Sequence, residues 1–128
     1  MPTPADSDNE PAPSGPGVRL VAEREALTTH LARLTHDMAA LVDASRDSNA
    51  DDEHDPEGQT IAYERAQLAA MTDQARAHLQ DVEAAQRRVA EGSYGRCDVC
   101  GEPIDPARLE ARPTAVTCVP HASARPTR

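Results

Sequence analysis

Three cysteines and one histidine near the C-terminal end of the chain are spaced like metal ligands. Cys97 and Cys100 form a C-x2-C pair, and Cys118 and His121 form a C-x2-H pair seventeen residues further on. Three thiolates and one imidazole are soft or borderline ligands, and four of them complete a tetrahedral Zn²⁺ site. Because protein side chains would fill every position, we predict one structural zinc ion rather than a catalytic one.

Other interpretations of the cysteines remain open. A redox-active C-x-x-C belongs at a helix N-terminus after a strand, and no such context is visible around Cys97 and Cys100. The cysteines could also be unrelated, although chance rarely places a second x2 pair downstream. An odd cysteine count and the lack of a signal-peptide pattern argue against a disulfide framework. We therefore expect a reducing, cytoplasmic location.

The composition limits the hydrophobic core and the partners. The 128-residue chain has no Trp, no Phe and only two Tyr, so it needs stability from a metal and from helix packing. Its formal net charge of -9 does not suit a protein that grips bare nucleic acid through phosphates. No apolar run approaches the ~20 residues of a membrane span. We therefore expect a protein partner and no membrane association.

Two stretches of the chain have the hydrophobic pattern of long helices. Residues 1–17 are rich in proline and are predicted to be a disordered arm. One apolar seam runs from about Val18 to Ser45, and a second from about Ile61 to Glu91 with Gly92 as the stop. The seam residues are Leu20, Leu27, Leu31, Leu34, Met38 and Leu41, then Leu68, Met71, Ala75, Leu79, Val82 and Val89.

These stretches predict an antiparallel coiled-coil hairpin over residues 18–91. An acidic tip at about residues 46–59 joins them, and within it Asp55-Pro56 is a good helix start. The predicted fold class is mainly α: a disordered arm, the hairpin, a zinc finger at residues 92–122 and a flexible tail at 123–128. A homodimeric coiled coil is the alternative, but adjacent acidic tips would repel each other, so we expect a monomer.

The tip contains candidate functional carboxylates. Asp52 and Asp55 form a D-x-x-D pair, and Glu57 follows. Such a cluster is more often a solvated loop, and the sequence leaves both interpretations open. Residues 53–64 fit a calcium loop in part, but Glu53 stands where Asp is expected and no second loop is present. The sequence shows no Ser/His/Asp or Cys/His arrangement for nucleophilic catalysis and no glycine-rich phosphate-binding loop, so we do not expect an enzyme.

The C-terminal motif resembles a known zinc finger. The run GSYGRCDVCGEPI at residues 92–104, followed by RLEARPTA at 108–115 and by Cys118, resembles the finger of the DksA/TraR family of bacterial transcription regulators. With the hairpin, the resemblance extends from about residue 18 to 121. It implies a zinc-containing regulator that binds RNA polymerase and inserts its hairpin into the secondary channel, without sequence-specific DNA binding.

The resemblance also implies roles for the tip and for the last metal ligand. Asp52 and Asp55 match the family's tip motif D-x-x-D-x-A, with Glu57 where Ala is expected. Carboxylates delivered there would act near the magnesium of the polymerase active site. His121 stands where the family has a fourth cysteine, which makes the predicted ligand set Cys3His.

The resemblance also bears on two arginines of the finger and on the response to an effector. Arg108 and Arg112 match the family's R-L-x-A-R-P run and would either brace the finger against the hairpin or contact an effector. Asp81 and Ala122 stand where members that respond to guanosine tetraphosphate (ppGpp) have basic residues, which implies a weak or absent response.

The alternative function is a zinc-stapled coiled-coil adaptor or homodimer that binds another protein. Only the polymerase regulator requires the acidic tip.

Overall fold

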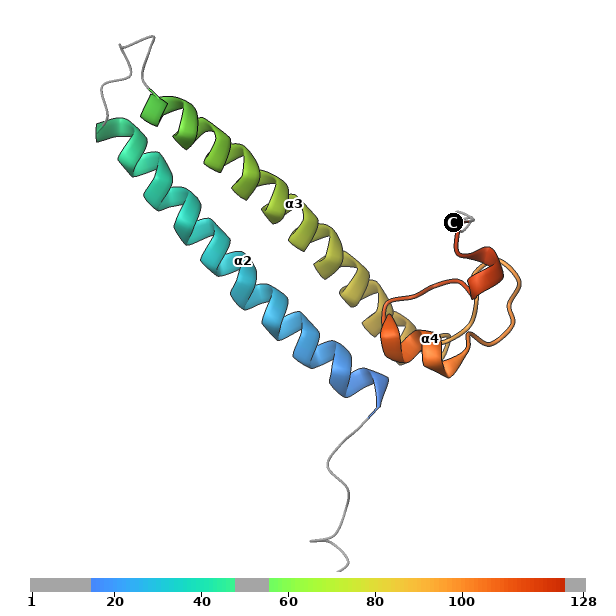
Figure 1. Cartoon of the computed structure of the whole chain (residues 1–128). Coiled ribbons are helices and arrows are strands. Elements are labelled where there is room, and N and C mark those ends of the chain that lie inside the picture. Colours follow the sequence, from blue (N-terminus) through green and yellow to red (C-terminus); the bar gives the residue numbers. More distant parts are fainter. Residues whose placement is uncertain (1–14, 48–55, 124–128) are drawn as a thin grey trace, which may run out of the picture. The chain divides into compact units, whose positions relative to one another are not determined.

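The computed structural model describes residues 15–47 and 56–123. Its elements are α2 (Pro16–Asp47), α3 (Pro56–Glu91), α4 (Pro106–Ala111) and the 3-10 helix η1 (Val119–His121) (Figure 1). The only β-type pairing in the described ranges is a single antiparallel bridge between Arg96 and Pro103. Helices α2 and α3 form a hairpin that precedes the finger, so the predicted mainly α fold class is confirmed. No helix in these ranges has an apolar stretch long enough to cross a bilayer.

Both long helices begin earlier than their hydrophobic patterns predicted. Helix α2 begins at Pro16 instead of about Val18. Helix α3 begins at Pro56, which agrees with the helix start predicted at Asp55-Pro56 and precedes the apolar pattern that begins at about Ile61. Proline suits a first helical position because its φ is already helical and it lacks the N–H that would remain unpaired there. The polar segment predicted at residues 46–59 is correspondingly shorter. The arm up to residue 14, the centre of the tip at 48–55 and the tail from 124 lie outside the described residues.

Helix α3 ends at the glycine that the sequence predicted as its stop. Gly92 has φ 80°, in the left-handed region that favours glycine. The Ser93 N–H donates to the Arg88 carbonyl at 2.9 Å, and the Gly92 N–H donates to the Val89 carbonyl at 3.3 Å. These two bonds are the Schellman pattern, which satisfies carbonyls that the helix end would otherwise leave unpaired. The finger therefore starts from a defined helix end.

The chain divides into two compact units with small cores. In the unit of residues 24–81, which is the distal part of the hairpin, Leu34 and Ala75 are buried. In the other unit, which contains the start of α2, the end of α3 and the finger, Leu20 and Val82 are fully buried. Side chains of this size bury little area each, so the finger's metal and hydrogen bonds must contribute to stability.

Most of the predicted seam residues are buried or half-buried, but Met71 is 40% exposed. Thr72 is half-buried in its place, because a helical seam can pass from Leu68 to Ala75 in steps of four and three as well as three and four. The Thr72 hydroxyl donates to the Leu68 carbonyl at 2.8 Å, which satisfies that hydroxyl at a half-buried position. Met71 is left on the outer side of the seam. Val89, near the end of α3, is exposed as well.

Candidate metal centre

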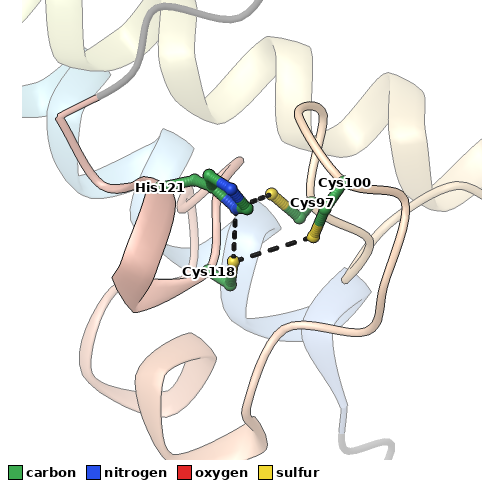
Figure 2. A group of neighbouring side chains, drawn as sticks. All are labelled: Cys97, Cys100, Cys118 and His121. Carbon is green, nitrogen blue, oxygen red and sulfur yellow. Dashed lines mark hydrogen bonds between the residues drawn. The ribbon is translucent and has the colours of Figure 1, made fainter.

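The first pair of candidate ligands lies in a tight turn. The Gly101 N–H donates to the Cys97 carbonyl at 2.9 Å, and the Cys97 N–H donates to the Glu102 carbonyl at 2.9 Å. Gly101 has φ 75°, which a residue with a side chain adopts at a cost. The Val99 N–H also points to the sulfur of Cys97, at 3.4 Å. The turn directs the thiols of Cys97 and Cys100 into the same space (Figure 2).

The second pair flanks and ends the short helix η1. Cys118 precedes this helix in an extended conformation, with φ -72° and ψ 168°, and His121 is its last residue. The His121 N–H donates to the Cys118 carbonyl at 3.0 Å. Residues i and i+3 eclipse one another in a 3-10 helix. The Cys118 thiol and the His121 ring are therefore neighbours, and Pro120 between them stiffens the turn.

The four donor atoms converge on one point (Figure 2), lying within 4.8 Å of one another. The Sγ atoms of Cys100 and Cys118 are 3.8 Å apart, and Nδ1 of His121 is 3.8 Å from Sγ of Cys97 and 3.1 Å from Sγ of Cys118. Zinc bonds of about 2.0 to 2.3 Å at tetrahedral angles separate such donors by about 3.6 to 3.8 Å. The distances from Cys100 to Cys118 and from Cys97 to His121 match these values, and the distance from His121 to Cys118 is shorter. The donor types and their grouping therefore fit one zinc ion. Among the described residues this is the only group of three or more potential ligands so arranged.

The pKa values of two thiols of the site, those of Cys97 and Cys118, are shifted in opposite directions. Burial alone raises the pKa of the Cys97 thiol. Hydrogen bonds from the backbone N–H groups of Cys100, Cys118 and Val99 outweigh this effect and lower that pKa to about 6. At Cys118 the pKa is raised, first by burial and then by hydrogen bonds with the neighbouring thiols. A bound zinc ion, when present, would hold all three sulfurs as thiolates.

Hydrogen bonds join the two ligand-bearing turns into one unit. The Asp98 N–H donates to the Val116 carbonyl at 2.8 Å. Nε of Arg108 donates to the carbonyl of Thr117 at 2.8 Å, directly before Cys118. Thr117 is buried, so this carbonyl needs a partner inside the protein. Arg108 thus supports the second ligand pair from within the finger.

Helix α4 positions the two arginines that the sequence singled out. It begins at Pro106 after Asp105, whose carboxylate accepts the Ala107 N–H at 2.9 Å as an N-cap. It ends before Arg112, whose N–H donates to the Arg108 carbonyl at 2.7 Å. The Arg112 side chain is exposed. Its bracing or effector contact stays a prediction.

Two other arginines connect the finger to the long helices. Nη2 of Arg88, at the end of α3, donates to Oδ2 of Asp98 at 2.9 Å. Nη2 of Arg19, near the start of α2, donates to the Glu110 carbonyl at 2.9 Å. Sequence reasoning missed both contacts because nothing local marks the partner of an arginine on a helix surface. The only available signal was that both arginines lie within a turn of a helix end.

Tyr94 joins the start of the finger to the segment after α4. Its hydroxyl donates to the Pro113 carbonyl at 2.7 Å. Burial raises the pKa of the phenol; the charge of Arg19 lowers it and that of Glu23 raises it, and the net direction is upward. The phenol is therefore held in the protonated form that can donate this hydrogen bond.

The predicted tip is described only in part. Asp52 and Asp55 lie outside the described residues. Glu57 is exposed in the first turn of α3, where a carboxylate interacts favourably with the positive end of the helix dipole. Because that position already explains an acidic residue, a role of Glu57 in modulating polymerase stays a prediction.

The finger and the chain as a whole are similar to known proteins. Residues 92–120 match the family model "Prokaryotic dksA/traR C4-type zinc finger". The chain is 37% identical over 100 residues to the RNA polymerase-binding transcription factor DksA of Caulobacter vibrioides (strain NA1000 / CB15N), covering 78% of this chain and 61% of that protein. It is 39% identical over 75 residues to the uncharacterized protein YteA of Bacillus subtilis (strain 168), covering 59% of this chain and 31% of that protein. The chain thus spans less than two thirds of the length of either curated relative.

A solved structure has the same fold. Transcription factor DksA2 from Pseudomonas aeruginosa matches with a TM-score of 0.51 and 24% identity, over 83% of this chain and 81% of that chain. Fold and site together define a helical-hairpin protein with a C-terminal zinc finger. The finger itself matches the DksA/TraR zinc-finger family over residues 92–120. The predicted zinc cofactor is confirmed; the match ends one residue before His121, so the fourth ligand is assigned from its geometry.

Proposed function

We propose that this chain is a zinc-containing bacterial transcription regulator that binds RNA polymerase and inserts its hairpin into the secondary channel. The observation that supports this proposal most is the match, over 78% of the chain, to a relative named as an RNA polymerase-binding transcription factor. That match covers more than the finger, so it includes much of the hairpin that would enter the polymerase.

The dimensions of the helices suit insertion into a channel. Helix α2 has 32 residues and α3 has 36. At a rise of about 1.5 Å per residue, these helices are about 48 and 54 Å long. Helices of this length are long enough to reach into a channel of the polymerase.

The joining segment has the chemistry to act near a metal-containing active site. Four of residues 48–55 are acidic, namely Asp51, Asp52, Glu53 and Asp55. Their structure lies outside the described residues. Carboxylates brought close to catalytic magnesium would change the local potential and could bind or displace metal-bound water. Asp52 and Asp55 are the residues that we assign to this role, with Glu57 beside them.

The proposal has consequences for partners and location. The regulator acts as a cytoplasmic monomer, without catalytic activity of its own and without sequence-specific contacts to DNA. It responds weakly or not at all to ppGpp, because Asp81 is an exposed carboxylate where a polyphosphate ligand would require a basic side chain. Ala122 provides no positive charge at the second such position.

Binding and tip placement can be tested together. Zinc-loaded protein is mixed with core RNA polymerase in which iron replaces the catalytic magnesium, and iron-generated radicals cleave nearby chains. The proposal expects cleavage within residues 48–60. Binding without cleavage there would indicate a surface adaptor instead, and no binding would favour a zinc-stapled coiled-coil adaptor or homodimer with another partner.

The role of the tip needs a charge-matched control. The double variant Asp52→Asn, Asp55→Asn should bind polymerase like the original protein yet lose its effect on transcription in vitro. The variant Glu25→Gln, Asp81→Asn removes the same charge at exposed positions on α2 and α3. It should keep the effect. Equal loss in both variants would mean that net charge matters rather than the tip.

A further inference from the structure

Two histidines from different helices line one cavity on the hairpin. The cavity has a volume of 230 Å³ and lies entirely within the unit of residues 24–81. His30 belongs to α2 and His78 to α3. The full lining is Leu27, His30, Met71, Gln74, Ala75 and His78.

Helix periodicity explains why both rings reach this cavity. On α3, Gln74 and His78 are four residues apart and so lie on one face, and on α2, Leu27 and His30 are three apart. The two helices run in opposite directions, so these faces meet across the cavity. His30 is half-buried and His78 is exposed, which leaves the cavity accessible to ions from solvent.

The lining selects a class of ion. It contains no carboxylate, whereas Mg²⁺ and Ca²⁺ depend on oxygen ligands, mainly carboxylates. Two imidazoles suit divalent ions late in the first transition row, whose affinities rise towards Cu²⁺. The amide oxygen of Gln74 and water can complete the coordination. Separate helices hold the two imidazoles, so an ion bound to both would connect α2 to α3.

We propose that His30 and His78 form a second metal site, separate from the zinc finger, for a late first-row divalent ion such as Ni²⁺ or Cu²⁺. Because the two rings line one cavity only when the hairpin is paired, the ion binds the folded hairpin and stabilises it by mass action. The site would make the stability of the distal hairpin depend on the concentration of that ion. Zinc in the finger is not involved.

The test uses Ni²⁺, which avoids the oxidation of thiols by Cu²⁺. Tag-free, zinc-loaded full-length protein is titrated with Ni²⁺ in a calorimeter, while a chromophoric indicator reports any released zinc. We expect one Ni²⁺ per chain. The variants His30→Gln and His78→Gln should each bind about tenfold more weakly or worse, because losing one of two ligands removes chelation. His36→Gln is the matched control, since His36 is exposed on α2 and does not line the cavity.

A second measurement separates binding at the hairpin from binding elsewhere. Ni²⁺ should raise the thermal unfolding midpoint of the original protein and of His36→Gln, but not of the other two variants. Circular dichroism confirms that each variant remains helical. The proposal is overturned if the original protein does not bind Ni²⁺, if binding survives in His30→Gln or His78→Gln, if His36→Gln loses it equally, or if zinc is released in proportion to Ni²⁺ bound.

Discussion

The guanidinium of Arg88 in α3 donates a 2.9 Å hydrogen bond to the carboxylate of Asp98, which lies between the first two cysteines of the zinc finger. The side chains are 23% and 32% exposed, so the pair is partly shielded from water. It spans the turn at Gly92, where α3 ends. The orientation of the first ligand-bearing turn is thereby linked to the helix that precedes it.

Removing this pair should loosen the finger. We expect Arg88→Gln to lower the free energy of unfolding of the zinc-loaded protein by about 1 kcal/mol, measured by urea denaturation. With Asp98→Asn, the double variant should cost less than the sum of the single variants. Arg46→Gln is the control, because Arg46 and Asp43 are 3.9 Å apart and more than three quarters exposed. A comparable loss in that variant would contradict a specific role for Arg88.

Loss of the fourth ligand should weaken zinc binding. His121→Ala should lower zinc affinity roughly tenfold or more, and a competing chelator should then remove zinc that the original protein retains. The comparison variant is His36→Ala, at an exposed position on α2. Identical zinc retention by His121→Ala would show that water or another side chain completes the site.

Gly95 should be sensitive to the smallest substitution. It has φ 85°, and an added Cβ would lie 3.4 Å from Cδ1 of Leu109. Gly95→Ala should destabilise the finger by about 1 to 2 kcal/mol or slightly more. Gly101→Ala has the same backbone cost but open space around it, and should cost less. Gly17→Ala, in helical backbone 3.9 Å from Val89, should instead stabilise by about 0.5 kcal/mol. Thermal unfolding ranks the three variants, and any other order would refute this account.

Tyr94 should make stability depend on alkaline pH. The pKa of its phenol is raised in the folded state, so its contribution is complete below the ordinary pKa of about 10 and is lost as pH rises through the higher folded value. Tyr94→Phe removes the 2.7 Å hydrogen bond to Pro113 and should cost about 1 kcal/mol at neutral pH. The difference should shrink above pH of about 10. Tyr63→Phe, at a residue 69% exposed, should change little; a difference that persists at alkaline pH would argue against the hydrogen bond.

The parts that could be predicted from sequence are those with local signals. The x2 spacing of the ligands indicates turns that close within a few residues. Gly92 indicates a helix end, because the left-handed backbone conformation that ends the helix favours glycine at that position. Met71 could not be placed, because steps of three and four from Leu68 both fit a helical seam until the partner helix is present. The contact of Arg19 with Glu110 joins residues 91 apart, and no periodicity extends over that distance.

That same separation sets an order of folding. The zinc ligands span residues 97 to 121, so ion binding closes only a short loop, and each long helix forms from local contacts. The contact between Arg19 and Glu110 requires the hairpin to have closed before the finger can dock on α2. We therefore expect docking of the finger on α2 to be a late step in assembling this end of the molecule, and the hydrogen bond between Arg19 and Glu110 to break early in unfolding.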